Sequence, residues 1–229
     1  MASPRALLRY AESDEDLAAV SALRERAFGR FAGADPWDAQ ARHLMLWRGE
    51  RLIGTLRLTL WRGAAGQAGY SAQFYDLTRF FNHFPASLEV GRLCLCPESR
   101  DLFALPQLLG GVTLAAQESG AAVLFGCASF EGCDPAPHLP ALAHLAQSAL
   151  APAEWRPGQT LAGAVSLPDV APKGQVVFPA LLRGYLALGA RVSDHAVPDP
   201  VLNTLHVFTA LEPARIAPGR LKVLQSLAE

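Results

Sequence analysis

Residues 121–129 form a nearly uninterrupted apolar run, AAVLFGCAS, which limits the folds open to this chain more than any other segment. A strand that is apolar at consecutive positions is usually buried on both faces, as in a sheet covered by helices on each side. A helix is predicted over residues 102–119, with Pro106 in its first turns, where proline is tolerated. A further strand is predicted over residues 88–97. We therefore expect a central β-α-β arrangement in an α/β fold.

The flanking segments extend this arrangement to a mixed sheet. Ser13 and Asp16 resemble a capping box, so a helix is expected after them. Strands are predicted at residues 5–10, 42–48, 51–60, 190–196 and 203–211, with a tight turn at 48–51. Helices are predicted near residues 141–150, 179–188 and 216–227, a polar and aromatic loop at 67–86, and an extended excursion at 151–178. We expect one domain over residues 1–229, with a mixed central sheet flanked by helices.

Composition narrows the class of protein. Apolar residues make up 51% of the chain and charged residues 18%, and the formal net charge is −1. Such a charge creates no field that recruits nucleic acid. No apolar run is long enough to span a bilayer, and the start turns acidic too early for a secretory signal. We expect a cytoplasmic protein that either handles an apolar substrate or simply has a large core.

The four cysteines are Cys94, Cys96, Cys127 and Cys133. Without an export signal they are expected to be reduced thiols. The C-x-C pair could indicate a metal site, but the other two cysteines do not supply a second close pair. We expect buried free cysteines and no metal.

Residues 88–97, LEVGRLCLCP, place charged side chains in an otherwise apolar strand. With a period of two, Glu89 and Gly91 lie on one face and Arg92 on the other, unless a bulge at Gly91 brings both charges to one cleft. A buried charge is costly unless it is paired or used, and a glycine in a strand often marks a bulge or a close ligand. This strand is therefore a candidate reaction centre.

The same strand carries a resemblance to a known family. LEVGRLCLCPESRD resembles the ELGRFCLHP motif of the ornithine acyl-carrier-protein N-acyltransferases, a hemolysin-like family of the Gcn5-related N-acyltransferase superfamily. LFGCASFEGCDPAPH and residues 179–212 resemble further motifs of this family in the same order. Upstream, DPWDAQARHL and GTLRL are similar to DPFDxxCDHL and GTYRL. The resemblance covers the chain from about residue 23 to residue 211.

The resemblance implies a fold like that of acyl-homoserine-lactone synthases and a defined reaction. A fatty acyl group, typically 3-hydroxylated, would move from an acyl carrier protein to the α-amine of an amino acid, giving a lyso-aminolipid in ornithine lipid biosynthesis. The chain itself would need no cofactor, since phosphopantetheine arrives on the carrier protein. Three positions depart from the family pattern: Arg42 replaces Asp, Leu93 replaces Phe and Cys96 replaces His. Ornithine is the default acceptor, and the Arg42 change leaves glutamine or another amino acid open.

Two residues are predicted to be catalytic. The α-amine of an amino acid has a pKa of about 8, so something must accept a proton before or during its attack on the thioester. Glu89 is the candidate, either as that base or as an electrostatic anchor for the acceptor ammonium. Arg92 would hold a carboxylate. The alternative for both is a structural ion pair.

The predicted substrate-binding residues come from several segments. Asp35 and Asp38 flank Trp37 and would suit a dibasic acceptor, although a solvated loop is the alternative. Arg24 and Phe28 are four residues apart on one helix face, like a pair that shapes the acceptor site in the synthases, and Phe28 could equally be core. The full set is Arg24, Phe28, Asp35, Trp37, Asp38, Arg57, Leu93, Cys94, Phe125, Gly126, Cys127 and Ser129.

Residues 98–104, ESRDLFA, bear on the acyl donor. Relatives that use coenzyme A carry a glycine-rich pyrophosphate loop here, and this chain has no glycine in that stretch. A carrier-protein donor does not need the loop, and Arg100 could meet an acidic carrier protein. The apolar segments 80–84 and 102–103 could make a peripheral contact with the inner membrane.

Two other functions remain open at this point, an acyl-homoserine-lactone synthase and a non-catalytic module that binds acyl chains or carrier protein. A serine-nucleophile site at residues 193–195 is disfavoured, because adjacent side chains in a strand point apart. His195 and His206 are predicted to be structural.

Overall fold

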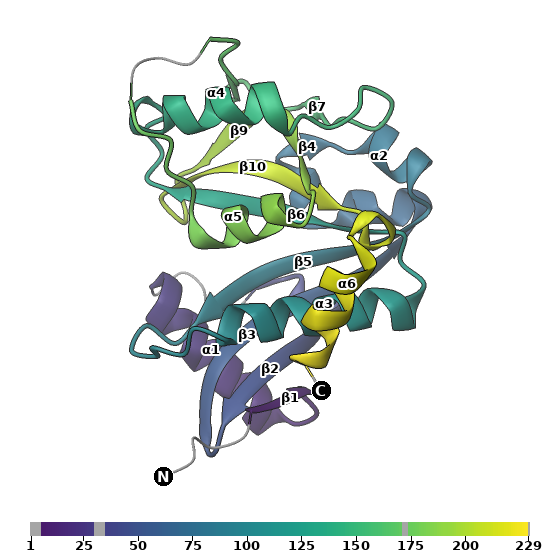
Figure 1. The fold of residues 1–229 in the computed structure, drawn as a ribbon, viewed down its shortest axis with the longest axis vertical. Coiled ribbons are helices and arrows are strands. Elements are labelled where there is room, and N and C mark those ends of the chain that lie inside the picture. Colours follow the sequence, from purple (N-terminus) through teal and green to yellow (C-terminus); the bar gives the residue numbers. More distant parts are fainter. Residues whose placement is uncertain (1–5, 30–34, 171–173, 229) are drawn as a thin grey trace. The chain divides into compact units, whose positions relative to one another are not determined.

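The computed structural model describes residues 6–29, 35–170 and 174–228 of the 229-residue chain (Figure 1). The chain forms two compact units. Unit 1 comprises residues 1–60, 88–121 and 217–229, and unit 2 comprises residues 61–87 and 122–216. Each unit is described by itself, and a single domain over residues 1–229 stays a prediction.

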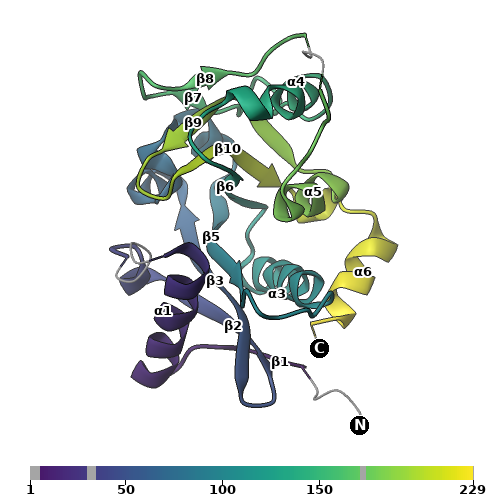
Figure 2. The same ribbon diagram turned by 90° about the vertical axis from the view of Figure 1, so that its left-hand side faces the viewer.

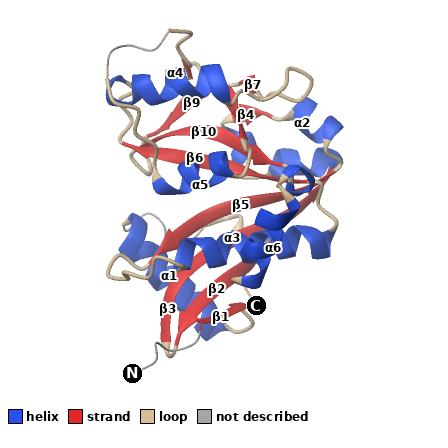
Figure 3. Ribbon diagram, viewed as in Figure 1, coloured by secondary structure: helices blue, strands red, loops and turns tan. Residues whose placement is uncertain are grey.

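Unit 1 is built on neighbouring strands in the order β1 (Ala6–Tyr10), β2 (Arg42–Arg48), β3 (Arg51–Arg62) and β5 (Ala86–Leu95). The β1–β2 and β2–β3 pairs are antiparallel, and Arg48 pairs with Arg51 at the predicted tight turn. The predicted strands and their hairpin are therefore confirmed (Figure 3).

Helices α1 (Asp14–Phe28) and α3 (Ala104–Ser119) lie on opposite faces of the unit 1 sheet (Figure 2). Strand alternation places His43 and Leu44 on opposite faces of β2. Arg24 of α1 contacts His43. A Cβ at Gly111 of α3 would run into Leu44, so α3 packs on the other face. Helix α1 begins where the capping box predicts, because the Ser13 hydroxyl accepts a hydrogen bond from the backbone N–H of Asp16 at 3.2 Å.

Unit 2 has a second set of adjacent strands, all antiparallel, and a separate two-stranded pair. The order is β6 (Val123–Glu131), β10 (Thr204–Leu211), β9 (Arg191–Asp199) and β8 (Val165–Ser166). Strand β4 (Tyr75–Asp76) pairs with β7 (Gly158–Gln159). The predicted hairpin of the last two long strands is confirmed.

The two faces of the unit 2 sheet have different cores. One face packs against α4 (Leu139–Ser148) and α5 (Ala180–Ala187), through aliphatic side chains such as Leu145 and Leu182. The other face carries an aromatic cluster that includes α2 (Thr78–His83), and its large rings are Trp61, Tyr75, Phe80, Phe81, Phe84, Phe125, Trp155 and Phe208.

The prediction that residues 67–86 form a polar and aromatic loop is wrong. The stretch holds β4, α2 and short 3-10 helices within Gly63–Ala68 and Ser71–Gln73. Its aromatic side chains enter the core because rings of this size bury a large apolar area, and that gain outweighs the weak local pattern. The rings of Phe80, Phe81 and Phe84 are buried, so they do not form the surface expected for a membrane contact.

The remaining elements are short. They comprise α6 (Pro218–Ser226), which packs on α3, and 3-10 helices at Asp38–Gln40, Ala136–His138 and Pro213–Arg215. Within the described ranges, no helix is both long and apolar enough to cross a membrane. All four cysteines are free, as predicted. Cys94 and Cys96 are buried, whereas Cys127 and Cys133 are half-buried, so the prediction of buried cysteines is confirmed for the first pair alone.

The contact between α3 and α6 gives a test of unit 1. A Cβ at Gly110 would collide with the backbone carbonyl of Leu224, so Gly110→Ala should force the helices apart. We expect the free energy of unfolding to fall by about 1–3 kcal/mol, as for overpacked cores, measured by urea denaturation. The control is Gly219→Ala in α6, where nothing lies within 4 Å of the added carbon. An equal effect of both substitutions would contradict this packing.

Candidate functional site

Unit 1 contains a buried cluster of arginines and carboxylates, with Asp35 at its centre. Its Oδ1 lies 2.7 Å from Nη1 of Arg57, and its Oδ2 lies 2.7 Å from Nε of Arg92. The Asp35 side chain is 3% exposed. Burial by itself would raise the pKa of Asp35, but Arg57 and Arg92 hold that pKa below its ordinary value. Asp35 is therefore a structural anion that fixes two guanidinium groups.

Asp38 is the second carboxylate of the cluster, and it is less enclosed. Its Oδ2 lies 2.6 Å from Nη1 of Arg24, and its Oδ1 lies 3.4 Å from Nη1 of Arg57. The same Arg57 nitrogen thus serves both aspartates. The Asp38 side chain is 26% exposed, so it can also reach a ligand. Of the two aspartates predicted to meet a dibasic acceptor, Asp38 is the one with an accessible carboxylate.

Strand β5 contributes the third arginine through an irregular backbone. Arg92 has a φ of 52°, an uncommon left-handed conformation for a residue other than glycine. The sequence analysis allowed for a bulge at Gly91, and the irregular backbone lies one residue later, at Arg92. This left-handed conformation explains how the Arg92 side chain reaches Asp35, although regular alternation would turn it to the other face.

Gly91 has a separate role in the cluster. A Cβ at this position would lie 3.2 Å from Nη2 of Arg57, tighter than most such contacts. The absence of a side chain lets the Arg57 guanidinium lie against β5. Glu89, two residues earlier, shares this face of the strand and is 4% exposed. The residue predicted to be the base therefore lies on the face of β5 that carries the arginines, and its catalytic role stays a prediction.

The other predicted residues of unit 1 surround the cluster at different depths. The Trp37 backbone N–H donates to Oδ1 of Asp35 at 3.1 Å, which fixes the loop before β2. Burial raises the pKa of the Cys94 thiol to about 12, so Cys94 is not a nucleophile at neutral pH. Leu93 is half-buried, and Phe28 is exposed at the end of α1, so the alternative that Phe28 belongs to the core is wrong.

The remaining predicted residues lie on β6 in unit 2. Phe125 is enclosed by aromatic rings, with centroids of Phe80 at 5.0 Å and Phe81 at 5.6 Å. It is a core residue, and a substrate contact would require this cluster to open. Gly126 is buried, Cys127 is half-buried and Ser129 is exposed. Substrate binding by these residues stays a prediction.

The adjacent residues Arg42 and His43 lie on opposite faces of β2, and the sequence analysis discussed the first and missed the second. His43 is buried in the cluster, with Nδ1 3.0 Å from Nη2 of Arg24, and it was not among the predicted site residues. Its place on the α1 face of β2 was a usable signal. Arg42 stacks on Tyr10 instead, with its Cζ 3.4 Å from the ring centroid. Because Arg42 and His43 are adjacent in the strand, Arg42 lies on the face away from the cluster.

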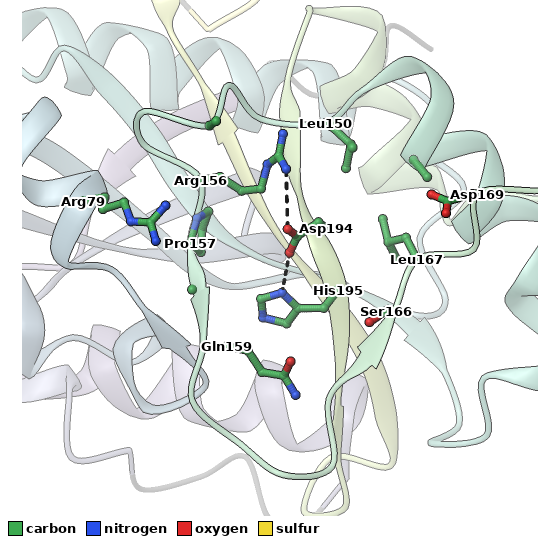
Figure 4. Close-up of a pocket in the computed structure, with 13 residues that line it drawn as sticks. Arg79, Leu150, Arg156, Pro157, Gln159, Ser166, Leu167, Asp169, Asp194 and His195 are labelled. Carbon is green, nitrogen blue, oxygen red and sulfur yellow. Dashed lines mark hydrogen bonds and ion pairs between the residues drawn. The ribbon is translucent and has the colours of Figure 1, made fainter.

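Unit 2 contains a cavity of about 550 Å³ with polar side chains on its wall (Figure 4). Nδ1 of His195 lies 2.8 Å from Oδ1 of Asp194, so these adjacent side chains meet, contrary to expectation. The Ser193 hydroxyl donates to the backbone carbonyl of His195 at 2.6 Å. The Ser193 hydroxyl thus donates to the backbone and not to His195, and the expectation that this triplet is not a serine-nucleophile site stays a prediction.

His206 is buried next to Tyr75, with its Nδ1 3.0 Å from the hydroxyl. Burial lowers the pKa of His206 to about 4, from an ordinary value of 6.5. Between these two pH values the unfolded chain binds a proton that the folded chain does not, so the stability of unit 2 should fall as the pH falls.

This linkage gives a stability test. The free energy of unfolding should lose up to about 3 kcal/mol through His206 as the pH falls from 6.5 to about 4. His206→Asn cannot take up this proton, so urea denaturation at stepped pH should give a shallower pH dependence for the variant. The same slope in both proteins would refute the assignment.

The ion pairs that Asp35 makes with Arg57 and Arg92 give a second stability test. Asp35→Asn removes the anion but keeps the shape, and leaves Arg57 and Arg92 with an uncompensated charge. We expect a loss of about 3–5 kcal/mol in the free energy of unfolding, measured by urea denaturation. The control is Asp16→Asn, which breaks a more exposed 2.6 Å pair with Arg9 and should cost much less. Similar losses in the free energy of unfolding for the two variants would mean that the ion pairs of Asp35 do not behave as a buried network.

Comparison with known proteins places these features in a family. A family model described as an acetyltransferase (GNAT) domain matches residues 10–109. An L-ornithine Nα-acyltransferase from Brucella abortus is 31% identical over 240 residues, covering 92% of this chain and 85% of that protein. The enzyme of the same name from Rhizobium meliloti is 30% identical, covering 91% of this chain and 80% of that protein.

Solved structures support the fold. An N-acyl amino acid synthase, FeeM, from uncultured soil microbes aligns with a TM-score of 0.54 and 14% identity, covering 95% of this chain and 99% of that one. The loading GNATL domain of CurA from Lyngbya majuscula aligns with a TM-score of 0.54 and 15% identity, covering 91% and 98%. The predicted α/β fold with a mixed sheet flanked by helices is confirmed. The chain belongs to the L-ornithine Nα-acyltransferase family and is an acyltransferase with the GNAT fold.

Proposed function

We propose that this acyltransferase moves a fatty acyl group from the phosphopantetheine thioester of an acyl carrier protein to the α-amine of ornithine. The product is a lyso-aminolipid. The observation that carries this proposal is the buried cluster of unit 1, in which Asp38 keeps an accessible carboxylate beside Arg24 and Arg57.

The charge pattern suits an amino acid with a second ammonium group. Asp38 offers a carboxylate for the side-chain ammonium of ornithine. The guanidinium groups supply the positive field that an α-carboxylate needs. The Arg42 departure does not weaken this choice, because Arg42 stacks on Tyr10 on the opposite face of β2. Ornithine therefore remains the first acceptor to test.

The proposed chemistry is a direct transfer. The neutral α-amine attacks the thioester carbonyl carbon, a nitrogen–carbon bond forms, and the carbon–sulfur bond breaks. Glu89 accepts the proton that the amine loses and then gives it to the departing phosphopantetheine thiolate, which leaves as the thiol.

The start of α3 supports a carrier protein as the donor. The Asp101 carboxylate accepts a hydrogen bond from the backbone N–H of Phe103 at 2.9 Å, and it lies 2.7 Å from Nε of Arg48. This carboxylate occupies the helix end where a pyrophosphate would bind in a coenzyme A enzyme. A pyrophosphate would meet this negative charge, whereas a carrier-protein arm brings no pyrophosphate to the site.

A peripheral membrane contact belongs to the same proposal. Leu102 is 88% exposed and Phe103 is 62% exposed, next to each other before α3. An amphiphilic product would leave the enzyme most easily at a lipid surface. This pair is the remaining candidate for such a contact, since the rings of residues 80–84 are buried. The expected location of the protein in the cytoplasm stays a prediction.

The acceptor is tested with purified wild-type protein, 3-hydroxypalmitoyl carrier protein and a panel of free amino acids. Mass spectrometry should detect an N-acylated product with ornithine, formed faster than with glutamine. A product with another amino acid alone would replace ornithine as the acceptor. Equal turnover with 3-hydroxypalmitoyl coenzyme A would remove the argument for a carrier-protein donor.

The role of Glu89 is tested by Glu89→Gln, which keeps the shape of the side chain but cannot accept the proton. We expect the transfer rate of the folded variant to fall by about 100-fold or more, with urea denaturation checking that the variant is folded. The control is Glu98→Gln, because the Glu98 side chain is 58% exposed and pairs with Arg51. Near-normal turnover by Glu89→Gln would remove this carboxylate from the mechanism.

A further inference from the structure

His43 lies between the charged groups of the unit 1 cluster. It is a cross-strand partner of Arg57 in the β2–β3 pair. Its Nδ1 lies 3.0 Å from Nη2 of Arg24, and its Nε2 lies 3.9 Å from Oδ1 of Asp38. The charged groups that face it are therefore Arg24 from α1, Asp38 from the loop before β2, and Arg57 from β3.

This geometry fixes the protonation state of His43. A guanidinium nitrogen can only donate a hydrogen bond, so Nδ1 must accept it with a lone pair. A neutral ring then carries its proton on Nε2, on the side of Asp38. A protonated ring would turn an N–H toward the Arg24 guanidinium and set one positive charge against another.

The contact with Arg24 also determines the position of Asp38. One end of the Arg24 guanidinium donates to His43, and the other end donates to Oδ2 of Asp38 at 2.6 Å. The two contacts together fix the plane of the guanidinium. Asp38 is the carboxylate of the cluster that remains accessible, so its position decides where an acceptor ammonium can bind.

We infer that neutral His43 is a positioning residue, which holds Arg24 against Asp38 so that the Asp38 carboxylate can bind the acceptor's side-chain ammonium. The inference rests on the proposed function, because it assigns Asp38 to the acceptor. Protonation of His43 breaks the hydrogen bond to Arg24 and releases this arrangement.

The surroundings keep His43 neutral near pH 7. Burial lowers the pKa of His43 below its ordinary value of 6.5, and the positive charge of Arg24 lowers it further, against the opposing effect of Asp38. The ring therefore takes up a proton at a lower pH than an ordinary histidine does. The KM for the acceptor should rise as the pH falls below 6.5, while kcat changes less.

Two variants at this position separate positioning from simple structural support. His43→Asn keeps a hydrogen-bond acceptor near the place of Nδ1 and cannot be protonated. It should keep a nearly normal KM for ornithine at pH 7.5, and it should lack the additional rise in KM below pH 6.5. His43→Leu removes the acceptor atom and should raise KM about tenfold or more at every pH, with kcat changed much less. Urea denaturation checks that both variants are folded.

A measurement that does not depend on turnover tests the same inference. In protein labelled with ¹⁵N-histidine, the NMR signals missing from His43→Asn belong to His43. They should show an unprotonated Nδ1 and a proton on Nε2 at pH 7. A proton on Nδ1 at pH 7, or an unchanged KM profile in both variants, would overturn the inference. If wild-type protein transfers no acyl group to any amino acid, the proposed function fails, while the NMR result still decides the state of His43.

Discussion

The site of unit 1 depends on Arg57, whose Nη1 lies 2.7 Å from Asp35 and 3.4 Å from Asp38. A buried guanidinium is stable only when its charge is compensated, and here two carboxylates from one short loop compensate it. Arg92 and Arg24 then pair with the outer oxygens of the same carboxylates. The segment before β2, helix α1 and strands β3 and β5 are thereby joined by one ionic network.

This network explains two local features of β5 that are unfavourable by themselves, the left-handed backbone of Arg92 and the glycine at position 91. Arg92 adopts a left-handed backbone, which allows its side chain to reach Asp35. Position 91 is glycine because a Cβ would press on the Arg57 guanidinium. A buried ion network adds little to stability compared with apolar packing. Its presence in the core of unit 1 is therefore better explained by a role in substrate binding or catalysis. An acyltransferase that binds a charged amino acid needs fixed charges at the place where the acceptor binds.

Sequence reasoning recovered most elements and the main residues of the cluster, because the apolar periods, the capping box and the family motifs are local signals. It failed where tertiary contacts decide the outcome. The aromatic segment at residues 67–86 looked like a loop, yet its rings form a core with side chains from β6 and β10. His43 was missed although it lies in the matched DPWDAQARHL segment, because its role depends on a tertiary contact: α1 packs on β2 and brings Arg24 to the ring.

The central claim is that the arginines and aspartates act as one unit in the enzyme. It is tested most directly by a double-mutant cycle of Asp35→Asn and Arg92→Gln, read as kcat/KM for ornithine. If the two residues are coupled, the kcat/KM of the double variant should be no lower than that of the less active single variant. The coupling energy should be about 1–3 kcal/mol. Additive losses would contradict the claim, because they would mean that the two residues act independently.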